Sequence, residues 1–135
     1  MTVVFTPTEV RAIVRALAAV AAADGAVLGR EEAFLEGFAM AHGELIGTHA
    51  LLSSPLDDAQ LKLLGQVVVD PAKRRQVVLL CLEMAMSDRE YAPSEEQLVT
   101  RIADALGIDA EERGRMTLAT QYKVDNEGTN PYARG

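Results

Sequence analysis

The feature that most constrains this chain is an internal repeat with a constant offset of sixty-four residues. The segment DGAVLGREEAFLEGFAMAHG at residues 24–43 is echoed by DREYAPSEEQLVTRIADALG at residues 88–107. The matching apolar positions follow helical spacing, which indicates one buried helix face in each copy. We therefore expect two related helix–loop–helix units. The acidic residues that recur are Asp24 with Asp88, Glu31 with Glu95 and Glu32 with Glu96, and the first two pairs place an aspartate and a glutamate seven residues apart across each loop.

Helical spacing, capping residues and glycine stops predict an all-α fold, a compact bundle of about six or seven helices built on the two repeated units. One helix start is Thr6-Pro7 with Glu9 completing a capping box, and another is Asp70-Pro71. Ser94 is expected to cap the helix that ends at Gly107. The expected helices are residues 7–23, 30–43, 57–68, 71–87, 94–107 and 109–122, with a further short helix considered within 44–56.

Length and composition limit the classes of function. With 135 residues the chain fits a single domain, assigned to residues 1–122, followed by a flexible, polar C-terminal tail at 123–135. A net charge of −7 argues against nucleic acid or an anionic membrane surface as partner. We find no secretory signal and no apolar run of membrane-spanning length, so we expect no membrane insertion and a cytoplasmic location. The lone Cys81 lies in an apolar run and is expected to be a buried thiol.

The repeated acids allow two interpretations. In the first, each aspartate bonds the backbone of its own loop and each glutamate lies in the favourable first turn of the next helix. In the second, all four carboxylates meet across a pseudo-twofold axis and bind a divalent cation, with calcium, magnesium or zinc as candidates. Neither loop has the ligand spacing of an EF-hand, so one loop alone is insufficient. A basic side chain from a partner protein is a third possible occupant. The candidate metal ligands are Asp24, Glu31, Asp88 and Glu95.

Other polar groups give weaker indications. His42, Glu44 and His49 match no common zinc spacing, and we interpret the histidines as a helix-end and a loop residue. The basic cluster at residues 73–75 is expected to pair with neighbouring acids, with a docking patch for an acidic partner as the alternative. No nucleophile–base pair or phosphate loop is evident, and we predict no catalytic residues. An enzyme that uses paired carboxylates is the least favoured hypothesis.

Two segments carry a family resemblance. AVAAADGAVLGREE at residues 19–32 and LEMAMSDREYAPSEEQLVTRIADALGID at 82–109 resemble the tellurite-resistance TerB-like family, and they are similar to the N-terminal domain of a membrane-anchored DnaJ-type co-chaperone. The resemblance implies two related helical halves, a cation site at the four repeated acids, and action with other stress-response proteins. The chain departs from the pattern at Arg89, which stands where the first loop has Gly25. An arginine beside Asp88 can neutralise it, which weakens the case for metal in that half.

Together these observations predict a non-enzymatic TerB-like module in a bacterial stress-response or metal-linked assembly, which binds a divalent cation at the repeated acids. The alternative is a plain protein-interaction or oligomerisation domain whose acids only cap helices. The expected partners are proteins, other stress-response proteins among them, and a homo-oligomer is left open.

Overall fold

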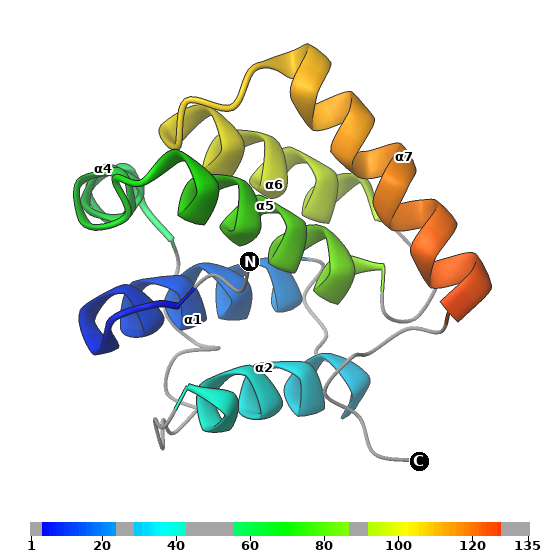
Figure 1. Cartoon of the computed structure of the whole chain (residues 1–135), viewed down its shortest axis with the longest axis horizontal. Coiled ribbons are helices and arrows are strands. Elements are labelled where there is room, and N and C mark those ends of the chain that lie inside the picture. The colour runs from blue at the N-terminus through cyan, green and yellow to red at the C-terminus, as the bar shows by residue number, and fades with distance from the viewer. Residues whose placement is uncertain (1–3, 24–28, 43–55, 87–91, 128–135) are drawn as a thin grey trace.

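A computed structural model describes residues 4–23, 29–42, 56–86 and 92–127, without the side chains of residues 29–31 and 126–127. All regular structure in these ranges is helical, which confirms the predicted all-α class (Figure 1). The short helix considered within 44–56 lies almost wholly outside the described residues. The helices are α1 Pro7–Ala21, α2 Gly29–Ala41, α4 Asp58–Val67, α5 Pro71–Ala85, α6 Pro93–Ala105 and α7 Ala110–Glu127.

The sequence repeat is a repeat of structure. Helices α1 and α5 begin and end at positions separated by the same offset as the sequence echo, and so do α2 and α6. The buried faces also coincide. The buried apolar residues of α5 are Val77, Val78, Leu80, Cys81, Leu82, Met84 and Ala85, and their equivalents in α1, all buried too, are Ile13, Val14, Ala16, Leu17, Ala18, Val20 and Ala21.

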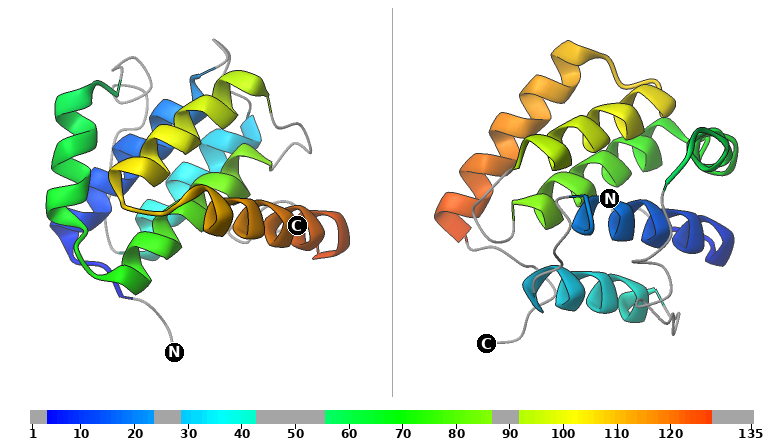
Figure 2. Two further views of the ribbon diagram at one scale, coloured as in Figure 1. Left: turned by 90° about the horizontal axis from the view of Figure 1, so that it is seen from above. Right: turned by 180° about the vertical axis from the view of Figure 1, so that it is seen from behind.

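The two units pack with their first helices together. Helices α1 and α5 lie side by side and run in roughly the same direction, while α2 returns along α1 and α6 returns along α5 (Figures 1 and 2). Helix α4 crosses the end where α1 and α5 begin, packing on α1 and α6, and α7 lies against α5. The buried residues of all six helices form one continuous apolar core, because each helix contributes its apolar face to the same interior.

Most predicted helix starts and stops are present. The Thr6 hydroxyl accepts from the N–H of Glu9 at 3.2 Å, and the Glu9 carboxylate accepts from the N–H of Thr6 at 2.7 Å. Asp70 accepts from the N–H groups of the next helix, at 2.8 Å for Ala72. Gly107 ends α6 with a φ of 73°, the left-handed conformation that glycine adopts without strain. These local bonds explain why the expected helix boundaries agree with the structure within about two residues at most termini.

Two predicted boundaries are wrong. Helix α6 begins at Pro93 with Ala92 as the cap residue, so Ser94 lies inside the first turn and is not the cap. Helix α7 does not end near Tyr122 but continues to Glu127, so residues 123–127 are helix and not tail. The extension is held by packing, since Val124 is only 2% exposed and the Lys123 ammonium lies 3.0 Å from the Glu83 carboxylate. Residues 128–135 lie outside the described residues, and the flexible tail stays a prediction there.

Candidate functional site

The structure describes only one of the four predicted metal-ligand side chains. Asp24 and Asp88 lie outside the described residues. Glu31 belongs to the first turn of α2, but its side chain is not among those described. Glu95 in the first turn of α6 is described in full. Whether the four carboxylates converge on one ion therefore stays a prediction.

Glu95 has a clear structural role. Its side chain is buried at 3% exposure, and one carboxylate oxygen accepts a hydrogen bond from the N–H of Ala92 at 3.1 Å. Ala92 has only a methyl group and cannot return a bond, so Glu95 supplies the side-chain half of this helix start. A carboxylate in this position is also stabilised by the positive end of the helix dipole. The first-turn placement predicted for Glu95 is confirmed.

The two acidic loops begin from matching helix ends. Ala22 closes α1 with φ −90° and ψ −1°, and its equivalent Met86 closes α5 with φ −92° and ψ 4°. Each donates its N–H to the carbonyl four residues earlier, at 3.0 Å from Ala22 to Ala18 and 2.9 Å from Met86 to Leu82. The starts of α2 and α6 lie at this same end of the bundle (Figure 1). All four helix ends that flank the loops are therefore gathered on one side of the molecule.

The described residues contain no other cluster of metal-binding side chains. Among the described side chains, those of residues 4–23, 32–42, 56–86 and 92–125, no three His, Cys, Asp or Glu are grouped closely enough to hold a metal ion. The ring of His42 lies in an aromatic cluster, with centroids 4.5 Å from Phe38 and 5.5 Å from Phe5. Its Nδ1 lies 2.9 Å from the Phe38 carbonyl oxygen. The interpretation of His42 as a helix-end residue is confirmed, while Glu44 and His49 lie outside the described residues.

An ion pair marks the axis between the two units. The Lys73 ammonium lies 2.8 Å from the Glu9 carboxylate, and these two residues occupy equivalent positions in α5 and α1. Contact between equivalent residues of two helices that run in the same direction is the arrangement expected of a pseudo-twofold axis between the units. Burial raises the pKa of Glu9, but hydrogen bonds from Lys73 and Thr6 outweigh burial and hold that pKa below its usual value.

Arg74 joins the ends of two helices. Its guanidinium donates to the carbonyl oxygens of Gly65 at 2.8 Å, Val68 at 2.7 Å and Leu106 at 3.2 Å. These carbonyls belong to the C-terminal ends of α4 and α6, where backbone acceptors have no partner within their own helix. The expected pairing with acids is confirmed for Lys73 and for Arg75, which lies 3.3 Å from Glu112, but Arg74 binds backbone instead.

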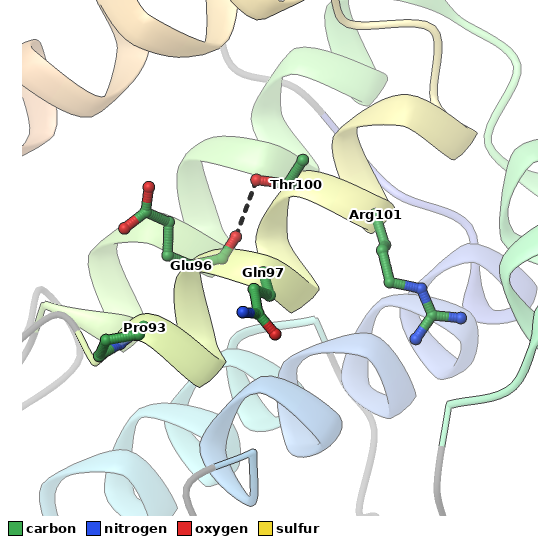
Figure 3. Close-up of a pocket in the computed structure, with 5 residues that line it drawn as sticks. All are labelled: Pro93, Glu96, Gln97, Thr100 and Arg101. Carbon is green, nitrogen blue, oxygen red and sulfur yellow. Dashed lines mark hydrogen bonds between the residues drawn. The ribbon is translucent and has the colours of Figure 1, made fainter.

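A pocket of about 530 Å³ lies along the outer face of α6 (Figure 3). Arg101 at one end of the pocket pairs with Asp58 of α4 at 2.8 Å, and the Thr100 hydroxyl donates to the Glu96 carbonyl at 2.8 Å. The accessible lining of the pocket is mainly apolar, and it carries a carboxylate and a guanidinium at separate positions along the helix. Its lining residues among the described part of the chain are Pro93, Glu96, Gln97, Thr100 and Arg101.

The lone thiol is buried as predicted. Cys81 is fully inaccessible in the centre of α5, and burial raises the pKa of its thiol to about 12. A thiol that stays protonated is a poor nucleophile and a poor metal ligand. Cys81 is therefore a core residue. Among the residues that the structure describes, no helix has the length and apolar character needed to cross a membrane.

Comparison with known proteins agrees with the sequence resemblance. The family model described as tellurite resistance protein TerB matches residues 59–118, a little under half of the 135 residues. The matched segment runs from α4 into α7 and contains the whole second unit, α5 with α6. A search of curated proteins and a search of solved structures found no match. The resemblance to the TerB-like family is thus confirmed over residues 59–118, and the first unit lies outside the matched segment.

Proposed function

We propose that this chain, TerB-like over residues 59–118, is a non-enzymatic helical module of the tellurite-resistance type that binds one divalent cation between its two acidic loops. In this role it acts within a bacterial stress-response or metal-linked assembly. The observation that carries the proposal is the matched geometry of the units, whose four loop-flanking helix ends share one side of the bundle.

Coordination chemistry favours a shared ion over two separate ones. Calcium takes six to eight oxygen ligands, and the two candidate ligands of each unit, one aspartate and one glutamate, are too few to fill such a shell. Asp24 and Glu31 from the first unit with Asp88 and Glu95 from the second would together supply four carboxylates, and backbone carbonyls and water complete such shells in other proteins. Arg89 reduces the negative charge beside Asp88, which makes an independent site in the second loop less favourable still.

The hydrogen bond at Glu95 is compatible with this role. An ionised carboxylate has about four lone-pair positions and can accept a hydrogen bond and bind a metal ion at the same time, so the bond from the N–H of Ala92 does not oppose the role. The bond also fixes the orientation of the carboxylate, and ligands held by a second hydrogen bond bind metal with less loss of conformational freedom. Glu95 would then serve the helix start and the ion together.

Isothermal titration calorimetry with calcium, magnesium and zinc tests the proposal. We expect the wild-type chain to bind at least one of these ions below millimolar concentration. The double variant Asp24→Asn with Asp88→Asn should lose that binding, because it removes one carboxylate from each loop at nearly constant size.

A matched control removes the same number of charges elsewhere on the same helical hairpins. Glu36→Gln with Glu96→Gln changes one exposed residue on α2 and one on α6, and should leave the affinity for the ion within about twofold. If the wild type binds no ion, or if the aspartate double variant binds as well as the wild type, the shared site does not exist.

The second candidate function is a protein-interaction domain whose acids only cap helices. The bond between Glu95 and the N–H of Ala92 favours it, because this contact accounts for a buried glutamate without any ligand. The same calorimetry separates the two functions. If the chain binds no divalent cation and the Glu95→Asp substitution clearly lowers its stability, the repeated glutamate acts on the helix alone.

A further inference from the structure

Helix α7 presents an exposed stripe directly opposite its packing face. Thr120 and Val124 are 3% and 2% exposed and face the core, whereas Leu118 and Tyr122 are 74% and 71% exposed. Single exposed apolar residues are common on protein surfaces and need no explanation. Two large ones at a spacing of four on one helix form a continuous apolar contact surface.

The stripe extends to charged residues on both sides. Arg115 lies three positions before Leu118, with its side chain 66% exposed, and the exposed Asp125 lies three positions after Tyr122. The spacings of three, four and three are those of alternating a and d positions in a coiled coil, which place all four residues on one face. We name this set the α7 stripe, and its members are Arg115, Leu118, Tyr122 and Asp125.

The order of residues in the α7 stripe is self-complementary. Arg115 and Asp125 lie equally far from the midpoint of the stripe at position 120, and so do Leu118 and Tyr122. If a second helix with the same sequence lies antiparallel across this midpoint, each arginine reaches the level of an aspartate and each leucine reaches the level of a tyrosine. A twofold contact requires a surface that matches itself in this way.

We propose that two copies of this chain pair through α7, antiparallel, with Leu118 of each copy against Tyr122 of the other and Arg115 of each against Asp125 of the other. The Arg115 guanidinium already contacts Glu111 of its own helix at 2.9 Å, and its five N–H donors leave room for a second carboxylate. The charge match selects a second copy as occupant, since an unrelated apolar partner would gain nothing from the symmetric placement of arginine and aspartate.

The pairing is expected to be weak. One helix with two apolar residues buries less surface than a stable dimer needs, and the net charge of −7 on each copy opposes approach. We therefore expect a dissociation constant on the order of tens to hundreds of micromolar at physiological ionic strength.

Charge reversal with exchange of partners tests the proposal by sedimentation equilibrium. The wild type should dimerise. Arg115→Asp alone brings aspartates together and Asp125→Arg alone brings arginines together, so each single variant should associate at least about tenfold more weakly. An equimolar mixture of the two variants restores both opposite-charge pairs, and should form a heterodimer about as tightly as the wild type.

Two further variants complete the test. Lys62→Asp makes the same change of charge as Arg115→Asp on an exposed residue of α4, and should dimerise like the wild type. Leu118→Ser replaces an exposed apolar side chain without a change of charge. It should weaken association, and circular dichroism should show unchanged helix content. A wild type that stays monomeric up to about 1 mM, single reversals that dimerise normally, or a mixture no tighter than its components would each overturn the proposal.

Discussion

The first and second helical units share their boundaries and their buried faces, but they differ at the axis where they meet. Position for position, Glu9 in α1 corresponds to Lys73 in α5, and Val10 corresponds to Arg74. Val10 is completely buried in the apolar core, whereas Arg74 reaches three carbonyl oxygens at the ends of α4 and α6. A duplicated framework has thus kept its core and diverged where additional helices had to be attached.

This divergence has a physical reason. Helix α4 packs on α6 of the second unit and on α1 of the first, and α7 packs on α5. Each attached helix brings unpaired backbone groups or charges that need partners. Arg74 satisfies helix-end carbonyls, Arg75 reaches Glu112 of α7, and Lys73 neutralises Glu9 of the first unit. The three adjacent cations therefore point to three different neighbours. They act as connectors and do not form one docking patch.

The largest expected effect tests whether the units share one core. Phe38 in α2 and its equivalent Ile102 in α6 are both completely buried. Phe38→Ala should cost about 3 to 5 kcal/mol and Ile102→Ala about 2 to 5 kcal/mol, because each leaves a cavity among packed side chains. Urea denaturation should show a single transition in both variants. Two separate transitions would mean that the halves fold independently and would break the comparison.

The next effect tests the connector role of Arg74. Arg74→Met should destabilise the fold by roughly 2 to 3 kcal/mol, since three carbonyl groups at helix ends lose a charged donor. Arg75→Met is the matched control, because its side chain is 60% exposed and its ion pair within the described part of the chain is an exposed one with Glu112, and it should cost less than about 1 kcal/mol. Equal losses for the two variants in thermal unfolding would show that Arg74 is an ordinary surface cation.

A third effect tests how closely α4 is attached to the second unit. A Cβ added at Gly65 would lie 2.8 Å from the backbone carbonyl oxygen of Ala105 in α6, so Gly65→Ala should destabilise by about 1 to 2 kcal/mol. Around Gly114 in α7, no described atom beyond the neighbouring residues and the helix's own backbone lies within 4 Å of such a Cβ, and Gly114→Ala should instead stabilise by up to about 1 kcal/mol through helix propensity. Calorimetric melting measures both, and a stabilising Gly65→Ala would contradict the close packing of α4 on α6.

The smallest effect concerns the ion pair at the axis. The pKa of Glu9 is lower in the folded chain than its value of 4.5 in the absence of partners, so its contribution to stability is complete above that pH and is lost as pH falls through the folded pKa. Glu9→Gln should cost about 1 kcal/mol at neutral pH, and the gap to the wild type should shrink in acid. A gap that stays constant from neutral pH down to pH 3 or so would argue against a charged Glu9 at the axis.

Local signals explain what could be predicted from the sequence. Residues only a few positions apart determine the helices, the caps at Thr6 and Asp70 and the end of α6 at Gly107. The internal repeat predicted the two related helical units. Ser94 was the wrong cap because Pro93 at the first helical position and Glu95 at the third make Ala92 the cap residue, two residues earlier.

Contacts between distant segments explain what could not be predicted. Helix α7 continues past Tyr122 because Val124 packs on the core and Lys123 pairs with Glu83 of α5. The mostly polar sequence after Tyr122 indicates neither of these contacts. The carbonyl partner of Arg74 on Leu106 lies 32 residues away. Glu9 and Lys73 carry opposite charges at equivalent positions of the repeat, so their pairing could in principle be predicted from the sequence. Such a prediction would require knowledge of how the two units pack against each other. The convergence of the four acids on an ion stays a prediction.

The number of ions bound per chain tests the central claim most directly. Native mass spectrometry of the wild type with calcium, magnesium or zinc measures that number without assumptions about affinity. A single site shared by the two units predicts one ion per chain, absent from the Asp24→Asn, Asp88→Asn double variant. Two ions per chain, or no ion at all, would contradict a site built jointly by the repeated loops.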